Sequence, residues 1–412
     1  MVFACNGAVI WSVISLFLLS LGATPFHLGL LEMGSRGGMA VRLLAAHLLS
    51  RIGKVRLMVL CRTAMLLPVA FLATLALRGS DDGGTSIWLA LAVMVVVTVF
   101  SQAGNTAWWP LVQDNTTKTG LGGFLSRMHI RQRSIDLVLP LVIGWYLGTD
   151  PSSRHFAPLF ALSIGANLLA SFIVRKISEP AAPVADSHYW RRLVDAARLP
   201  ALRRYGLFAI AYGLVTAAIL PFWVVVLSDA GMGAVYFVWM TSVSAFGPIV
   251  ALPGWGRLID AHGSRSTLSL ALVSKGFLGL AWLAIPADPL LLVLWATAQF
   301  FLWGILTSGS TMAQNRVMMD AVPAERQAEG FALAVLASAV GGAVGGLAGG
   351  VALQWFTPTA GGWDPRLGYL AGVQMTLIAV WYLGSFLSGH GEQRSLSSLV
   401  LARNRRNDRE YQ

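Results

Sequence analysis

Three charged residues interrupt an apolar run between residues 29 and 50: Glu32, Arg36 and Arg42. Glu32 and Arg36 are four residues apart, so on a helix they share one face and can form an ion pair. Arg42 lies about 80° to the other side of Glu32, and all three fit an arc of roughly 120°. Charges at membrane depth usually face protein or a water-filled cavity. All three are therefore candidates for binding or coupling to a solute, with Arg42 the first candidate for gating or for attracting an anion. Glu32 and Arg36 could instead pair near the lipid headgroups.

Polar residues on other apolar runs extend this set. Asn105 and Trp108 place an amide beside a large aromatic ring, which suits a planar or cationic solute. A tryptophan here is equally expected at a membrane interface. Lys275 lies in the middle of an apolar run and needs a carboxylate or a hydrated path, but the sequence does not indicate its partner. The other candidates for substrate binding or coupling are Asp136, Tyr212 and Gln299.

The elements that must position these residues are apolar. Hydrophobic residues make up 56% of the chain and charged residues 12%, and the mean hydropathy is +0.65, whereas a soluble domain has roughly 25% charged residues. The sequence divides into about a dozen apolar runs, each of roughly the 20 residues that cross a bilayer core. Because lipid offers no partner to backbone polar groups, we expect an all-α membrane protein. Twelve transmembrane helices are predicted near residues 6–26, 29–50, 57–77, 87–109, 130–149, 157–175, 205–228, 232–254, 267–286, 289–312, 329–354 and 368–388.

The formal net charge of +11 indicates orientation in a membrane rather than a nucleic-acid partner. Most of the 30 lysines and arginines fall on segments of one predicted face, and only Arg78, Arg154 and Arg366 fall on the other. An excess of positive charge marks the cytoplasmic side. We therefore expect both termini to be cytoplasmic. A composition rich in Ala, Gly and Arg favours a bacterial cytoplasmic (inner) membrane, or a membrane derived from it.

A short motif from Gly254 to Arg265 joins two predicted helices and reads G-W-G-R-L-I-D-A-H-G-S-R. It resembles the signature loop of the major facilitator superfamily, Gly-x-Leu-x-Asp-(Arg/Lys)-x-Gly-(Arg/Lys). Ala261 replaces the first base, and the final base stands one place late. The resemblance implies two pseudo-symmetric six-helix bundles, a solute site near the bilayer midplane and transport by alternating access. The matching positions are Gly256, Leu258, Asp260, Gly263 and Arg265.

The first half of the chain contains a second copy of this plan. Gly53 takes the place of Gly263, and further along Asp114 takes the place of Asp320. Two positions differ: Ser50 stands where the second half has Asp260, and Pro110 stands where it has Arg316. In the superfamily this acid and this base approach one another. We therefore expect a coupled pair, Asp260 with Arg316, in the second half alone.

Opposite charges also predict a latch between the halves. In superfamily geometry the basic loop around Lys54 faces the acidic start of the helix at 329–354 (Asp320, Glu325, Glu329), and Asp260 faces the basic start of the helix at 130–149 (Arg127, Arg131, Arg133). The alternative is ordinary surface charge, each pair contributing at most about 1 kcal/mol. The predicted gating and latch residues are Asp260, Arg265, Arg316, Gly256, Gly263, Arg51, Gly53 and Lys54.

The predicted domains are an N-terminal six-helix bundle (1–175), a cytoplasmic linker with an amphipathic helix (176–204), a C-terminal six-helix bundle (205–388) and a basic cytoplasmic tail (389–412). Glycines recur at spacing four from Gly341 to Gly350 in the helix at 329–354. Such small residues permit close helix contact. This pattern suits an interface that slides between two states, or simply tight packing.

The sequence contains no enzyme constellation, because its seven histidines lack metal-ligand spacing and it has no phosphate-binding Gly-Lys loop. We therefore expect no catalytic residue, no metal and no cofactor, and a gradient rather than ATP as the energy source. The first hypothesis is a secondary transporter (symporter or antiporter) of a small solute, with proton coupling as an option. The alternative is a non-transporting membrane protein of the same fold that acts as a receptor or assembly partner. The expected partners are a small-molecule or ion substrate and the lipid bilayer, with the protein a monomer.

Overall fold

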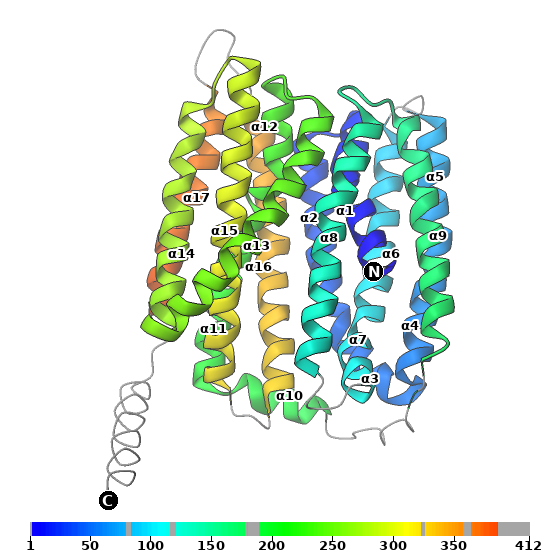
Figure 1. The fold of residues 1–412 in the computed structure, drawn as a ribbon, viewed down its shortest axis with the longest axis vertical. Helices are drawn as coiled ribbons and strands as arrows, with labels where there is room; N and C mark the ends of the chain where they lie inside the picture. The colour runs from blue at the N-terminus through cyan, green and yellow to red at the C-terminus, as the bar shows by residue number, and fades with distance from the viewer. Residues whose placement is uncertain are drawn as a thin grey trace, which may run out of the picture.

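The computed structural model describes residues 2–79, 84–115, 121–177, 179, 189–322, 326–356 and 364–385. Every regular element in these ranges is a helix. Eight helical stretches within them are long and apolar enough to cross a membrane. The chain is a multi-pass membrane protein built from long helices that run in roughly the same direction (Figure 1). The predicted tail at 389–412 and Glu325 of the predicted latch lie outside the described residues.

The first half of the chain forms six long helical segments, some of them broken by a short 3-10 turn or a kink. They coincide with the predicted spans between residues 6 and 175. In chain order they are α1 (Val2–Ser20); α2 (Pro25–Gly37) continued by η1 (Gly38–Ala40) and α3 (Val41–Ile52); α4 (Lys54–Ala64) with α5 (Leu66–Arg78); α6 (Thr85–Thr106) with α7 (Trp108–Asp114); α8 (Leu121–Leu147); and η2 (Ser153–Phe156) with α9 (Ala157–Val174).

The second half repeats this arrangement after a short helix, α10 (Tyr189–Ala197), in the segment predicted to be a linker. Its six long segments coincide with the predicted spans from 205 onward. They are α11 (Pro200–Ala217) with η3 (Leu220–Phe222) and α12 (Trp223–Asp229); α13 (Ala234–His262); α14 (Ser264–Leu278) with η4 (Gly279–Ala284); α15 (Pro289–Ala321); α16 (Gln327–Trp355); and α17 (Pro365–Ser385).

Two glycines at matching places show the repeat at the level of backbone angles. Gly53 ends α3 with φ 96° and ψ 157°, and Gly263 ends α13 with φ 83° and ψ 160°. A positive φ is costly for residues with a Cβ, so both turns favour glycine. Each turn leads directly into the next helix, α4 or α14. The predicted correspondence of the two loops is therefore present in their geometry.

The outer surface of the bundle is apolar, as expected for contact with lipid. Leu67, Trp145 and Trp355 are each close to 80% exposed. Inside, a continuous buried cluster runs through both halves and includes Phe17, Phe160 and Trp223. In water such large exposed apolar side chains would be a liability. The burial pattern thus agrees with a chain folded in a bilayer.

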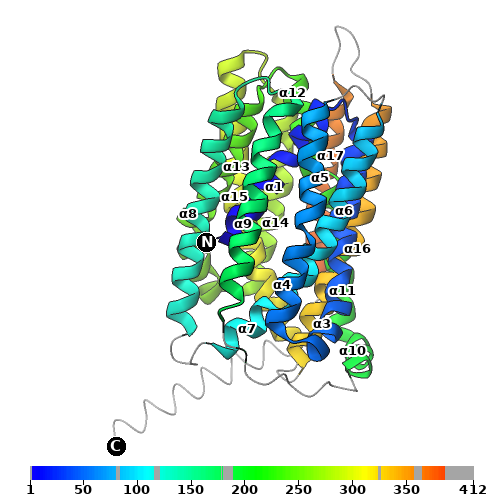
Figure 2. The ribbon, with the colours of Figure 1, turned by 90° about the vertical axis from the view of Figure 1, so that its right-hand side faces the viewer.

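The two ends of the bundle can be told apart by α10, which lies across one of them (Figures 1 and 2). We call this end the linker face and the other end the opposite face. On α10, Leu193 and Ala196 are buried while its arginines face outward. Arg192 of α10 forms an ion pair with Glu329 at the start of α16, at 3.2 Å. The linker helix is therefore fixed to the second half.

Two pairs of helices form the seam between the halves: α2 with α16, and α8 with α13. At the first, Gly29 is so close to Gly350 that a Cβ on either glycine would lie 2.9 Å from the other's Cα. At the second, the Trp239 indole donates to the carbonyl of Leu141 at 3.0 Å, and the Ala234 N–H donates to the carbonyl of Thr149 at 2.9 Å. These contacts lie toward the opposite face, where α2 and α13 begin. The halves therefore meet backbone to backbone at that end.

Candidate functional site

A cavity of about 610 Å³ lies where the halves meet, between α8 on one side and α13 and α15 on the other. It extends from the middle of the bundle toward the linker face, where α15 ends. Polar side chains in a concave site fix the orientation of a bound solute. The described lining contains an ion pair, Trp303 and six hydroxyl or amide side chains: Thr241, Ser244, Thr307, Ser308, Thr311 and Asn315.

The ion pair in the cavity comes from one turn of α8. Arg133 Nη1 lies 3.8 Å from Asp136 Oδ2, and both side chains are partly exposed. Pro140, four residues further along, has no N–H to donate to the carbonyl of Asp136. Among the eight predicted substrate or coupling residues, Asp136 alone belongs to the described cavity lining.

Lys275 lies behind the cavity wall and is fully buried on α14. Its Nζ donates to Tyr212 Oη at 2.9 Å and to Ser310 Oγ at 3.1 Å, and lies 4.5 Å from the ring centroid of Trp303. The sequence indicated a carboxylate or a hydrated path. Within the described ranges the partners are instead two hydroxyls and an indole ring. Tyr212, a predicted candidate, thus acts on Lys275 rather than on the described cavity surface.

Arg62 on α4 is a second buried cation, for which no role was predicted from the sequence. Its Nη1 donates to Asn167 Oδ1 and its Nη2 to Asn105 Oδ1, both at 3.2 Å. The predicted candidate Asn105 therefore accepts a hydrogen bond from arginine. Its partner is 43 residues away on another helix, a separation at which a single sequence carries no pairing signal.

The three charges that interrupt the apolar run on α2 and α3 do not line the described cavity. Arg36 Nε lies 2.7 Å from Glu32 Oε1, which is the predicted pair. The pair packs against α16: a Cβ on Gly346 would lie 2.8 Å from the Glu32 side chain, and one on Gly342 would lie 2.9 Å from that of Arg36. Arg42 Nε donates to Gln102 Oε1 of α6 at 2.8 Å. Glu32 and Arg36 thus belong to the seam, and Arg42 to contacts within the first half.

Two further candidates, Trp108 and Gln299, pack against other helices of the bundle. Trp108 packs at the edge of a small buried cluster around Met58 and Ala107. Gln299 is 3% exposed, and its Nε2 donates to the carbonyl of Leu278, at the end of α14, at 3.3 Å. Neither belongs to the described cavity lining. Burial in contacts between helices, which composition does not reveal, separates them from the solute space.

The gating residues of the second half meet as expected. Arg316 Nη1 of α15 lies 3.1 Å from Asp260 Oδ1 of α13, at the linker face and largely exposed. Arg265 is half-buried just after the Gly263 turn. Gly256 has room around it, since the nearest atom to an added Cβ would be Met312 Cε at 3.7 Å. Close packing therefore does not require glycine at position 256, and the role of these residues in gating stays a prediction.

The contacts predicted for a latch between the halves are not among the described contacts of this conformation, in which the cavity extends toward the linker face, so the latch stays a prediction. Lys54 pairs with Asp114 of α7 in its own half, and its backbone N–H donates to Glu179. Asp260 pairs with Arg316, also within its own half. Glu329, expected opposite the loop of Lys54, pairs with Arg192 of α10. Arg51 is exposed at the end of α3. In this conformation each of the paired charges therefore has a partner in its own half or on α10.

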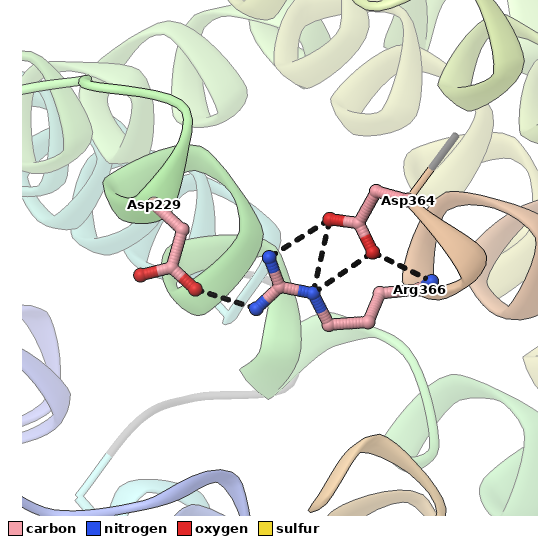
Figure 3. Close-up of polar contacts among 3 residues, drawn as sticks. All are labelled: Asp229, Asp364 and Arg366. Atoms are coloured by element: carbon pink, nitrogen blue, oxygen red, sulfur yellow. Dashed lines mark hydrogen bonds and ion pairs between the residues drawn. The ribbon is translucent and has the colours of Figure 1, made fainter. Parts of the chain in front are cut away.

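One cluster at the opposite face was not anticipated from the sequence. Arg366, at the start of α17, is buried and bonds both Asp364, at 2.8 Å from Nη2, and Asp229, at the end of α12 (Figure 3). Asp364 also accepts from the backbone N–H of Arg366 at 2.9 Å. The cluster joins two segments of the second half, so its role is structural.

No protein-family model matches the sequence, and no curated protein matches it. Solved structures do. The chain superposes on the nucleoside transporter NupG with a TM-score of 0.70, 14% identity, and coverage of 93% of this chain and 96% of that one. It superposes on a bacterial homologue of the iron transporter ferroportin, in an inward-facing state, with a TM-score of 0.67, 14% identity, and 94% and 96% coverage. It superposes on a D-xylose–proton symporter with a TM-score of 0.66 and 12% identity, and the alignment covers 93% of this chain and 94% of that one. The chain has the fold of the major facilitator superfamily.

The major facilitator fold explains where the cavity lies. Its two halves are repeats with a shared space between them, and the cavity is bordered by α8 from one half and by α13 and α15 from the other. The seam contacts at Gly29 and Thr149 join the halves at the opposite face. The cavity itself extends toward the linker face. In this conformation, then, the halves are in contact at the opposite face, and the cavity extends toward the linker face.

Proposed function

We propose that this protein is a secondary active transporter that moves a small solute across a membrane by alternating access. The observation that carries the proposal is the cavity between the two halves, which meet in backbone contacts at the opposite face; its lining contains hydroxyl, amide and charged groups. A receptor or assembly partner would not need a polar space at the depth of the membrane. The solved structures with the same fold include nucleoside, peptide and D-xylose–proton transporters.

The seam has the properties that a moving interface needs. On α16, Gly342, Gly346 and Gly350 face α2, and contact there is between backbone and aliphatic atoms. Small residues let two helices come close without interlocking. The halves can therefore separate at the opposite face by breaking few specific bonds, which alternating access requires.

Asp136 is the group in the cavity best placed to couple transport to a proton gradient. Its carboxylate is partly exposed in the cavity and paired with Arg133 at 3.8 Å. A carboxylate that changes its partner or its hydration between two conformations can change its protonation state. We therefore propose proton coupling through Asp136.

The location and orientation follow from the distribution of charge. We propose that the linker face is cytoplasmic, because the basic segments of the sequence lie there. Both termini would then be cytoplasmic, in a bacterial cytoplasmic membrane, and the cavity would be open to the cytoplasm. The protein would act as a monomer that has a small molecule or ion and lipid as its partners, and no nucleic acid.

Uptake by purified protein in proteoliposomes tests the proposal, with and without a pH gradient across the membrane. Entry of a solute above protein-free vesicles supports it, and accumulation driven by the pH gradient supports coupling. Asp136→Asn should abolish accumulation while leaving exchange of solute across the membrane. The matched control is Asp195→Asn, at a partly exposed position on α10 away from the cavity. No uptake of any small metabolite under either condition contradicts the proposal.

A further inference from the structure

Charges within the described spans are not evenly balanced around the cavity. The carboxylates Glu32 and Asp136 each lie beside an arginine of the same helix, Arg36 and Arg133. The ion pair in the cavity therefore adds no net charge. Lys275 differs from both arginines because its partners in the described structure are all neutral: Tyr212, Ser310 and the Trp303 ring. Arg42 and Arg62 also donate to neutral side chains, but those side chains lie outside the described cavity lining, whereas Trp303 belongs to it.

Among the residues that the structure describes, the helices around α14 place no carboxylate in an ion pair with the Lys275 ammonium. From α17, Gln374 donates to the backbone carbonyl of Lys275 at 2.8 Å. From α11 and α15 come the hydroxyls of Tyr212 and Ser310. Hydroxyl oxygens and an indole face attract an ammonium but do not cancel its charge. A buried charge without an opposite charge costs free energy of folding, and inside a membrane protein it marks a function by default.

The Lys275 ammonium lies next to the cavity. Its Nζ contacts the Trp303 ring, and Trp303 belongs to the cavity lining. One residue therefore separates the charge from the solute space. Lys275 itself is fully buried, so bulk salt screens it much less than a surface charge.

The cavity also offers a free hydroxyl near this charge. Thr307, on α15 one turn beyond Trp303, lines the cavity, and its Oγ1 is buried without a recorded hydrogen-bond partner in the described structure. Ser308 and Thr311 lie on the same wall. Hydroxyl groups can donate to the oxygens of a carboxylate, and a carboxylate accepts several such bonds.

We propose that the transported solute is a small carboxylate, and that Lys275 supplies the positive charge that attracts it into the cavity. The inference rests on the proposed transport function and specifies its substrate class. In a low-dielectric interior the field of an ammonium reaches beyond its contact shell. A solute with one negative charge completes the balance around the cavity, while a cationic solute is repelled.

The test presents wild-type proteoliposomes with solutes that match in size and differ in charge. The mixture contains a small-molecule extract of bacterial cells, supplemented with glucuronate and glucose, succinate and succinamide, and lactate and lactamide. Vesicle contents are measured by mass spectrometry and compared with protein-free vesicles. We expect carboxylates to enter through the protein, and the neutral member of each pair to stay at the protein-free level.

Variants at Lys275 then test the source of the attraction. Lys275→Met should reduce carboxylate entry by at least about tenfold, as expected for truncating a buried charged partner. Lys275→Arg keeps the charge and should retain most of the entry. Lys176→Met is the matched control, because Lys176 is exposed beyond the end of α9. Carboxylates should enter through this variant at the wild-type rate.

Three outcomes would overturn the inference. The first is entry of neutral or cationic solutes without carboxylates, which wild-type protein decides even if a variant fails to fold. The second is carboxylate entry through Lys275→Met at the wild-type rate. The third is no movement of any solute by wild type, which contradicts the transport function itself and the substrate class with it.

Discussion

In the first half of the chain the buried cation Arg62 donates to two asparagine side chains, and in the second half the buried cation Lys275 donates to two hydroxyls. Both lie on the helix that follows a glycine turn, α4 or α14. The amide partners of Arg62 come from helices of its own half and close around it. Lys275 instead contacts Trp303, which lines the cavity. Equivalent helices thus hold a cation that secures the bundle in one half and a cation beside the solute space in the other.

The ion pairs at the linker face also differ between the halves, because the pair of the first half is the more shielded from solvent. In the first half Lys54 pairs with Asp114, and Glu179 accepts from the backbone N–H groups of Lys54 and Val55. In the second half Asp260 pairs with Arg316, with side-chain exposures of 73% and 56%, against 12% for Lys54 and 24% for Asp114. A shielded pair with extra bonds holds its geometry better than an exposed one. The first half is therefore the more firmly fixed at this end, and the second carries most of the cavity wall.

The largest expected change in unfolding free energy comes from substituting one of two adjacent glycines on α16, Gly345 and Gly346. A Cβ on Gly345 would lie 2.0 Å from the carbonyl oxygen of Leu214 within the second half, whereas one on Gly346 would lie 2.8 Å from Glu32 Cβ and Cγ across the seam, a contact that separation of the two halves relieves. Gly345→Ala should destabilise the fold by about 3 kcal/mol or more, since backbone must move. Gly346→Ala should fold and should favour the state in which the seam is open. Thermal unfolding in detergent and labelling from the opposite face measure the two. Equal loss of stability in both variants would remove the distinction between a fixed and a moving face of α16.

The two buried cations should respond differently to the same substitution. Arg62→Met strands the side-chain oxygens of Asn105 and Asn167, at a cost of about 2–4 kcal/mol in unfolding free energy. Lys275→Met should cost less, because the Ser310 hydroxyl keeps its bond to the carbonyl of Thr307 and no buried amide oxygen loses its donor. Thermal unfolding of both purified variants makes the comparison. If Lys275→Met proved as destabilising as Arg62→Met, Lys275 would be a structural cation and not a functional one.

The exposed pair at the linker face should act on conformation rather than on folding. Asp260→Asn removes the ion pair with Arg316 and should change the unfolding free energy by at most about 1 kcal/mol. If the pair gates the cavity, the balance between inward and outward states should shift in an accessibility-labelling assay. Asp114→Asn, at the corresponding site of the first half, is the comparison. An unchanged balance in Asp260→Asn would show that the loop pair has no gating role.

The smallest effect concerns pH and the cluster of Arg366 at the opposite face. Burial raises the pKa of Asp364, but hydrogen bonds and charge from Arg366 outweigh it and hold that pKa below its ordinary value. The carboxylate then stabilises the fold above its unfolded pKa of about 3.9, and this contribution is lost as the pH falls through the lower folded value. Asp364→Asn should cost under about 1 kcal/mol at neutral pH. Thermal unfolding of both proteins should show the difference shrinking below about pH 4; a constant difference down to pH 2 would contradict the assignment.

Hydropathy and spacing were enough to predict the helical spans, the repeat and the glycine turns, because each depends on residues close in the sequence. The Glu32–Arg36 pair followed for the same reason. The residues that line the cavity were harder to predict from the sequence. Asp136 was found because a carboxylate in an apolar run is conspicuous, whereas Ser244 and Thr307 resemble ordinary residues of apolar helices. The partners of Lys275 and Arg62 come from distant helices, and neither charge nor spacing indicates a neutral partner.

Alternating access is tested most directly by labelling one cavity position from each side of the membrane. Thr311→Cys places a thiol in the cavity wall, in a background with Cys5→Ser and Cys61→Ser, and a membrane-impermeant maleimide is added to one side at a time. Without solute, position 311 should react from the linker face and not from the opposite face. With Gly346→Ala, which crowds the seam at Glu32, reaction from the opposite face should appear. Reaction from both faces at once in the unaltered seam, or from neither face under any condition, would contradict a protein whose two halves open their shared cavity to one side at a time.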